Sequence, residues 1–358
     1  MSFQNIMEEI ASGLTGDSEK DIAYLKEQQE KYRDHEMSPQ ISKAIGRLMY
    51  RAMPEDRRRE FDEAVKKQKI RWNEALEGVQ KERSAEGADQ EKLEEALARL
   101  EEMTAKIEEL LEQGRFRDDG ETEYHCFFEM FEMILYEQVS GTKKRQKSTD
   151  DVPVAAVYAE YGTLLMELGR TKEAQAALEK AVRWAPANCR IAFEYAETFK
   201  VLGEMDSFLK ITADTFRYVF RPAELARCYR NLGYYFIELE KWNEATACYL
   251  MSLQFDKDAQ NAQAELYFIS QKTGGELPKP SVDEIRVWGK EYGFPVGPDE
   301  NVVRTAVKYG MEYYRGGRYD LAQYFLKTAF DLTGDERLGK LAVSAVNAMR
   351  AKGQGSRR

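Results

Sequence analysis

Three segments of this chain repeat one pattern of small and large residues in the same 34-residue phase. In the first segment, residues 155–188, Gly162 and Ala174 take positions 8 and 20. The copies that begin at Ala226 and Val303 also place glycine at position 8 and alanine at position 20. Two helices that cross closely need small side chains at the crossing and large ones around it. The pattern therefore predicts stacked helical hairpins in an all-α fold.

This pattern resembles the tetratricopeptide repeat, a helix–turn–helix unit of 34 residues. Rings stand at the positions that surround the crossing, namely Tyr158, Tyr229, Phe236, Trp242, Tyr249, Tyr313 and Tyr319. More narrowly, residues 161–170, 179–188 and 226–242 look like a group of uncharacterised bacterial repeat proteins that carry a helical N-terminal extension. The resemblance implies a right-handed α-solenoid of helix pairs whose concave face binds peptides or protein segments.

The repeat phase also suggests how residues 153–358 are divided. One copy has Phe208 in place of the alanine at position 20, and another has its second helix delayed by residues 276–280. The end of a helical stack needs a cap over its open face. The expected segments are five repeats over 153–334, two of them degenerate at 189–222 and 259–292, a capping helix at 335–351, and a disordered tail at 352–358.

Residues 1–139 lack the repeat pattern and are expected to form a separate helical region. Residues 55–83 and 89–113 carry apolar side chains in alternating steps of four and three, which predicts a long coiled-coil-like hairpin over about 55–113. Two ordinary extended solenoid helices are the alternative. Further helices are expected at 18–35, 39–52 and 121–139, with the hairpin turn at 84–89 and a flexible polar linker at 140–152.

Composition favours an ordered cytoplasmic protein. The chain has 358 residues and a net charge of −10, and nucleic acid is not an expected partner because phosphates require a basic surface. No segment approaches the ~20 apolar residues that span a bilayer, so no membrane contact is expected. The first residues include Glu8 and Glu9 and lack the pattern of a secretion signal. The four cysteines form no C-x-x-C pair, which fits reduced thiols.

In such a stack, positions 2, 5, 9 and 12 of each first helix form a stripe along the concave face. Arginine binds carboxylates through two parallel hydrogen bonds, and arginine and tyrosine are favoured interface anchors. An acidic or C-terminal peptide is therefore the expected ligand. In the alternative, the arginines pair with acids on neighbouring helices or are solvated. The candidate residues are Arg190, Phe193, Glu197, Lys200, Arg227, Arg230, Asn231, Tyr234, Arg304 and Tyr314.

The sequence contains no pattern typical of an enzyme. His35 and His125 are its only histidines, and on a helix His125 and Cys126 would point about 100° apart. No spacing suits a zinc ion, and no cofactor is expected. The expected function is that of a non-catalytic adaptor or scaffold for a protein or peptide. Two alternatives stay open: a peptide-responsive signalling regulator hinged at the linker, and a structural homo-oligomer assembled through the hairpin.

Overall fold

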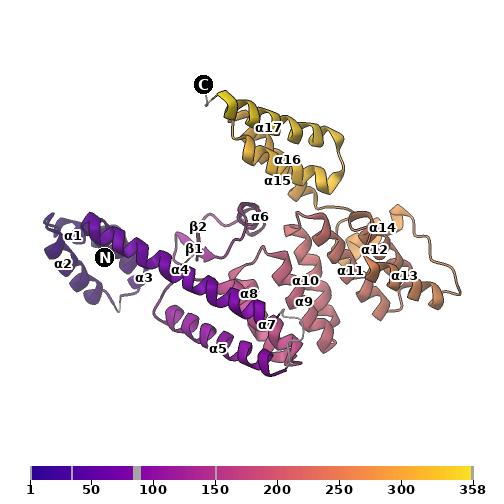
Figure 1. The fold of residues 1–358 in the computed structure, drawn as a ribbon, viewed down its shortest axis with the longest axis horizontal. Coiled ribbons are helices and arrows are strands. Elements are labelled where there is room, and N and C mark those ends of the chain that lie inside the picture. Colours follow the sequence, from indigo (N-terminus) through magenta and orange to yellow (C-terminus); the bar gives the residue numbers. More distant parts are fainter. Residues whose placement is uncertain (1, 34, 84–89, 150, 356–358) are drawn as a thin grey trace. The chain divides into compact units, whose positions relative to one another are not determined.

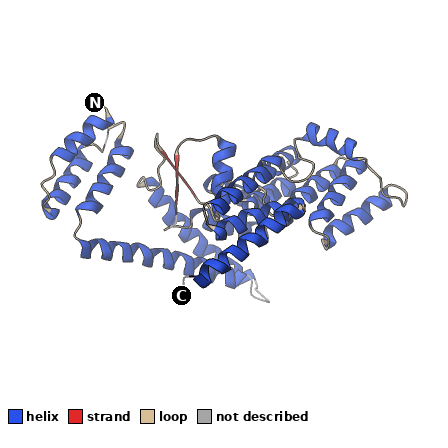
Figure 2. Cartoon of the chain, turned by 90° about the horizontal axis from the view of Figure 1, so that it is seen from above, coloured by secondary structure: helices blue, strands red, loops and turns tan. Residues whose placement is uncertain are grey.

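A computed structural model describes residues 2–33, 35–83, 90–149 and 151–355. Within these residues the chain forms seventeen α-helices, one short 3₁₀ helix and two short strands (Figure 2). Contacts divide it into two compact units. Unit 1 comprises Met1–Cys126 and Lys143–Leu164, and unit 2 comprises Phe127–Thr142 and Leu165–Arg358. Figure 1 labels the elements along the sequence.

Unit 1 begins with three short helices around a small apolar core. These helices are α1 (Phe3–Ser12), α2 (Ser18–Lys31) and α3 (Ser38–Ala52). The Ser2 and Asp17 side chains cap α1 and α2 by accepting hydrogen bonds from backbone amides of the first turn, which fixes where both helices begin. The buried apolar side chains of this core are Ile6, Ile10, Leu25, Tyr32, Ile41 and Ile45.

The two long helices of the predicted hairpin are present in unit 1. They are α4 (Glu55–Arg83) and α5 (Gln90–Glu112), and the predicted turn at 84–89 lies outside the described residues. The apolar seam is buried along α5, whereas on α4 only Leu76 and Val79 are buried. Earlier on α4, Phe61 is 49% exposed. The two helices therefore share an apolar seam over the second half of α4.

Residues 122–125 and 145–148 form two strands that the sequence did not predict. β1 (Thr122–His125) pairs in parallel with β2 (Arg145–Ser148). The expected helix at 121–139 is therefore shorter and begins later, as α6 (Met130–Ser140), and part of the expected linker is a strand. The cause is local: the Asp119 carboxylate accepts hydrogen bonds from the amides of Glu121 and Thr122 at 2.8 and 2.7 Å, which competes with helical hydrogen bonding.

Unit 2 is a solenoid of helix hairpins in which helices that are consecutive along the chain pack together, from α8 to α13 and from α15 to α17. α7 (Val154–Glu167) begins in unit 1 and ends in unit 2. The other elements of the solenoid are α8 (Thr171–Trp184), α9 (Cys189–Leu202), α10 (Met205–Thr215), the 3₁₀ helix η1 (Phe216–Tyr218), α11 (Pro222–Glu238), α12 (Trp242–Phe255), α13 (Gln260–Lys272), α14 (Val282–Tyr292), α15 (Glu300–Arg315), α16 (Tyr319–Thr333) and α17 (Glu336–Gly355).

The last helix differs from its predicted extent. α17 continues to Gly355, so the first residues of the expected disordered tail at 352–358 are helical, and residues 356–358 lie outside the described part of the chain. Ala345, near the middle of α17, is fully buried. An apolar face packed on α16 holds this helix in place.

Two of the position-8 glycines, Gly233 and Gly310, lie where the helices of a hairpin cross, as the pattern predicts. A Cβ atom on Gly233 would lie 2.6 Å from the ring of Tyr249, and one on Gly310 would lie 2.7 Å from the side chain of Leu326. Both contacts are far closer than carbon atoms tolerate. The helix pairs α11–α12 and α15–α16 therefore approach this closely only because position 8 has no side chain.

The turns inside four of the hairpins share one backbone geometry. Gly169, Gly203 and Gly317 occupy position 15 with φ of 74°, 73° and 71°. The next amide then donates to the carbonyl five residues earlier, as from Arg170 to Leu165 at 2.8 Å. Glu240 takes the same position with φ of 54°, although it is not glycine.

Candidate functional site

The predicted binding residues of α9 and α11 lie against one another. The Arg227 guanidinium stacks over the Phe193 ring, 5.0 Å from its centroid, and Phe193 is buried beneath it. Arg227 also forms an ion pair of 3.2 Å with Glu194 on α9. One face of this guanidinium is thus held by a ring and one edge by a carboxylate, while its side chain stays 36% exposed.

A second cation and ring meet further along the same two helices. The Lys200 Nζ lies 4.4 Å from the centroid of the Tyr234 ring and 2.9 Å from a carboxylate oxygen of Glu197. Tyr234 packs edge-on against Phe208 of α10, at 6.1 Å between ring centroids. Its pKa is raised, first by burial and then by nearby carboxylates, so the phenol stays protonated and able to donate a hydrogen bond.

Arg230 and Asn231 continue this surface toward neighbouring helices. The Arg230 Nη1 lies 3.2 Å from the Asp256 carboxylate and 3.2 Å from the Ser252 hydroxyl. Burial lowers the pKa of Arg230, whose side chain is 18% exposed. Asn231 donates to the Thr212 hydroxyl at 3.4 Å. Arginines of the predicted face do pair with acids on neighbouring helices, and their role in binding a ligand stays a prediction.

The remaining predicted residues lie elsewhere. Arg190 is exposed in the first turn of α9. Arg304, on α15, faces Glu300 one turn earlier at 4.0 Å and is 73% exposed. Tyr314 shares a hydrogen bond of 3.0 Å with Ser344 of α17. We call the gathered set the basic–aromatic strip: Phe193, Glu197, Lys200, Arg227, Arg230, Asn231 and Tyr234.

A second surface, which the sequence did not reveal, holds α6 against the repeats of unit 2. Phe131 of α6 is fully buried. Its ring centroid lies 5.2 Å from that of Phe220, which precedes α11, and 5.1 Å from that of Phe325 on α16. The only sequence signal was the density of aromatic residues and methionines in residues 127–136, which also fits an ordinary core helix.

Polar contacts surround this buried ring. Glu129 forms an ion pair with Arg221 and accepts a hydrogen bond of 2.6 Å from the Tyr324 hydroxyl. Gln138, at the other end of α6, accepts one of 2.5 Å from the Thr305 hydroxyl of α15. α6 is therefore held by residues from elements that lie far apart along the chain.

Glu132 is the buried acid of this surface. Its carboxylate accepts hydrogen bonds from the Phe128 amide at 2.7 Å and from the Asn188 side chain at 2.8 Å. Burial nevertheless raises the pKa of Glu132 to about 7, and the nearby carboxylate of Glu224 adds to that rise. Burial also raises the pKa of Glu224, while Arg221, 2.7 Å away, opposes the shift.

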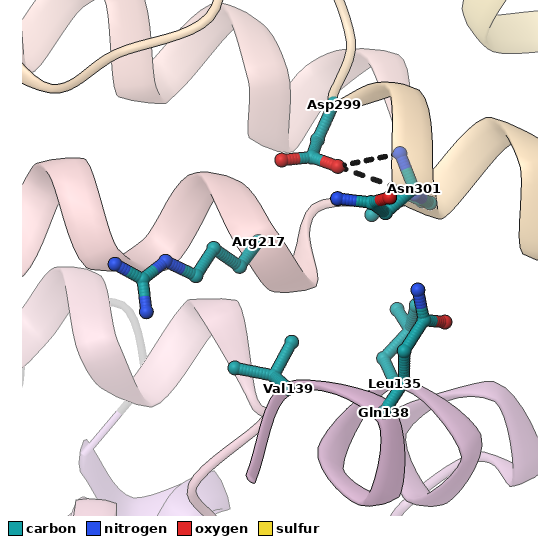
Figure 3. A pocket seen from close by; sticks show the side chains of 7 residues that line it. Leu135, Gln138, Val139, Arg217, Asp299 and Asn301 are labelled. Atoms are coloured by element: carbon teal, nitrogen blue, oxygen red, sulfur yellow. Dashed lines mark hydrogen bonds between the residues drawn. The ribbon is translucent and has the colours of Figure 1, made fainter. Parts of the chain in front are cut away.

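A cavity of about 230 Å³ lies beside the C-terminal half of α6. In Figure 3, Asp299 and Asn301 lie at the start of α15, across from Leu135, Gln138 and Val139 of α6. The Asp299 carboxylate caps α15 by accepting a hydrogen bond of 2.7 Å from the Asn301 amide. The residues that line the cavity are Leu135, Gln138, Val139, Arg217, Asp299, Asn301 and Val302.

The only histidine next to a cysteine lies at the end of a strand and not on a helix. His125 ends β1, with its Nε2 3.9 Å from Glu123, and the Cys126 sulfur lies 2.9 Å from the Thr149 hydroxyl. In extended chain, neighbouring side chains point to opposite faces, so the predicted divergence holds for a different reason. Among the described residues, no group of three acids, histidines or cysteines is placed to hold a metal ion. No described helix is long and apolar enough to cross a membrane.

Residues 155–188 match the model of the tetratricopeptide repeat family. No curated protein matches the chain. Among solved structures, the chain is similar to the crystal structure of YrrB, a tetratricopeptide-repeat protein with an unusual peptide-binding site, with 15% identity and a TM-score of 0.29 over 63% of this chain and 98% of that one. It is also similar to the APC/C hetero-tetramer Cut9–Hcn1, with 13% identity and a TM-score of 0.33 over 94% of this chain and 58% of that one. These TM-scores are too low to indicate a shared overall arrangement.

Proposed function

Given a tetratricopeptide repeat at residues 155–188, we propose that the chain is a cytoplasmic, non-catalytic protein-binding adaptor or scaffold. We further propose that the basic–aromatic strip binds an acidic segment of the partner. One observation carries this proposal: the strip holds two cations over rings, Arg227 over Phe193 and Lys200 over Tyr234, and leaves both cations partly exposed. Cations held in this way lose little conformational freedom when a carboxylate binds.

The ion pairs within the strip are compatible with a ligand. A guanidinium carries five N–H donors, and a carboxylate oxygen of Glu194 lies 3.2 Å from Nη1 of Arg227. A carboxylate of a partner can therefore bind the remaining donors while Glu194 stays in place. Exposed ion pairs contribute little to folding stability, so sharing or exchanging Glu194 costs little.

A comparison of two charge reversals tests this proposal. Arg227→Glu alters the strip, and Arg304→Glu makes the same change on an exposed helix surface outside it. The probe is a fluorescein-labelled acidic peptide with a free C-terminal carboxylate, followed by fluorescence anisotropy, with its amidated form as a comparison. We expect binding to the wild type and to Arg304→Glu, and at least tenfold weaker binding to Arg227→Glu.

Equal binding to all three proteins would contradict a site on the strip. A lysate pull-down with the wild type beside Arg227→Glu/Arg230→Glu extends the test to natural partners. A protein captured only by the wild type would identify the partner that uses the strip. The same proteins captured by both would place the binding surface elsewhere.

A second candidate function, a homo-oligomer assembled through α4, is favoured by one observation. Phe61 is 49% exposed on this helix, and its ring centroid lies 6.0 Å from that of Tyr50, which is itself 37% exposed. Two adjoining aromatic side chains left uncovered in this way offer a contact surface. A lower mass in light scattering for Phe61→Glu than for the wild type would support this function, and equal masses would exclude it.

A further inference from the structure

Residues 127–142, which we call the α6 arm, belong to unit 2, although the chain on both sides of them belongs to unit 1. The strands on either side of the arm, β1 and β2, pair in parallel, with Thr122 opposite Arg145 and His125 opposite Ser148. The arm therefore connects the end of β1 to the start of β2, and its side chains pack in unit 2. Covalent continuity does not require it to pack there.

The contacts of the arm have the composition of a protein–protein interface. Phe131 is a fully buried aromatic anchor, and polar pairs such as Glu129 with Arg221 surround it. A buried anchor inside a polar rim is the usual anatomy of an interface hot spot. Unit 2 therefore presents a surface that is already shaped for an amphipathic helix.

The arm does not fill this surface well. Glu132 brings a carboxylate into a buried position beside the Glu224 carboxylate, and two such groups in a low-dielectric region repel each other. The cavity of about 230 Å³ stays open next to Leu135 and Val139. A helix with an uncharged side chain in place of Glu132 would avoid the first defect, and bulkier side chains in place of Leu135 and Val139 would reduce the second.

We propose that the surface covered by the α6 arm is the docking site of a partner protein's amphipathic helix, and that the arm is a tethered competitor for this site. The partner helix carries a carboxylate two positions before an aromatic residue, because Arg221 and the Tyr324 hydroxyl both bind Glu129 and the Phe220 and Phe325 rings enclose Phe131. It carries glutamine or another uncharged polar residue directly after the aromatic residue. This proposal is independent of the basic–aromatic strip.

The test vacates the surface in the full chain and offers it a free helix. Phe131→Asp removes the anchor of the arm, and Glu129→Arg, at the rim, is a milder second variant for the case that Phe131→Asp does not fold. The probes are fluorescein-labelled peptides of residues 127–142, one with the natural sequence and one with the substitution Glu132→Gln. Circular dichroism verifies that each variant keeps its helices.

We expect the vacated variants to bind both peptides and the wild type to bind them at least tenfold more weakly, because a tethered arm competes at an effective concentration of about millimolar. Affinity for the natural peptide should fall at least tenfold from pH 5.5 to pH 8, because a docked Glu132 must take up a proton. Affinity for the Glu132→Gln peptide should not change over this range.

Three results would overturn the proposal. Folded variants that bind neither peptide would show that the arm is a fixed part of unit 2. A wild type with twice the chain mass in light scattering, beside variants with the mass of one chain, would show that the surface takes the arm of a second copy and not a partner helix, because only the wild type keeps the Phe131 anchor. In the wild type, excess Glu132→Gln peptide should speed hydrogen exchange in the arm, and unchanged exchange would count equally against the proposal.

Discussion

At the scale of single residues, Glu240 departs from its own repeat pattern. It occupies the left-handed turn position that glycine fills in three other hairpins, with φ of 54°. A side chain in this conformation costs roughly 1–2 kcal/mol relative to the right-handed region, and glycine avoids most of that cost. We expect Glu240→Gly to stabilise the chain by about 1 kcal/mol and to raise its melting temperature. Gly317→Ala, at the same position of another hairpin, should lower it.

Gly233 tests the close crossing of α11 and α12. An added methyl group would lie 2.6 Å from the Tyr249 ring, so the helices would have to separate. We expect Gly233→Ala to destabilise the chain by about 1–3 kcal/mol in denaturant titrations. Gly46 of α3 is the matched control, because nothing lies within 4 Å of its Cβ position and alanine favours a helix there. A similar loss for both would contradict the crossing argument.

The ionised Asp21 side chain makes the folding stability of unit 1 depend on pH. Its carboxylate accepts hydrogen bonds from the Thr15 amide at 2.6 Å and from the Gly16 amide at 2.9 Å, and these lower its pKa below the ordinary value of 3.8. The stabilisation is therefore complete above that value and is lost as the pH falls through the lowered pKa. We expect Asp21→Asn to melt below the wild type at pH 6, and the difference to shrink toward pH 2. A constant difference would mean that charge plays no part.

At the scale of elements, the repeats could be predicted from the sequence because each hairpin is specified locally. Gly233 and Tyr249 lie sixteen residues apart and meet within one hairpin. Their contact therefore joins two fixed positions of the repeat, and the repeat pattern predicts it. The strands and the start of α6 could not be predicted in this way. They depend on hydrogen bonds from backbone amides to Asp119 and on pairing between residues 122–125 and 145–148. Neither interaction produces a periodic pattern of apolar residues in the sequence.

Glu132 gives the docking of α6 an opposite dependence on pH. The folded chain holds its proton more tightly than the unfolded chain does, because the pKa rises from 4.5 to about 7. Stability therefore falls as the pH rises between these values. We expect the free energy of unfolding of Glu132→Gln to exceed that of the wild type by about 3 kcal/mol at pH 8, and its melting temperature to be higher there. Near pH 4.5 the two proteins should have similar stability. Equal melting at pH 8 would show that the buried charge is fully compensated.

At the scale of the whole molecule, the two candidate surfaces differ in how far the sequence could reveal them. The basic–aromatic strip joins α9 and α11, and its cation–ring pairs use positions 2, 5, 9 and 12 of successive repeats, so the period brings them together. Arg304 and Tyr314 share these positions, yet Tyr314 bonds instead to α17, which follows the last repeat. The α6 surface combines Phe131, Phe220 and Phe325, which no single period relates.

This combination makes Phe131 a link between distant parts of unit 2. Its ring contacts Phe220, beside η1, and Phe325, on α16, so its removal should loosen both at once. We expect Phe131→Ala to cost about 3–5 kcal/mol, as for a large ring deleted from a packed core. Hydrogen exchange should then speed up in residues 216–221 and in α16 together.

Phe128→Ala is the matched control, because Phe128 is 54% exposed and precedes the same helix. It should leave exchange in both regions unchanged. Faster exchange in α16 alone would mean that Phe131 stabilises one hairpin and does not connect the two regions. Faster exchange in both would show that a segment without the repeat pattern holds the repeats of unit 2 together, because no contact within a single hairpin joins Phe220 to Phe325.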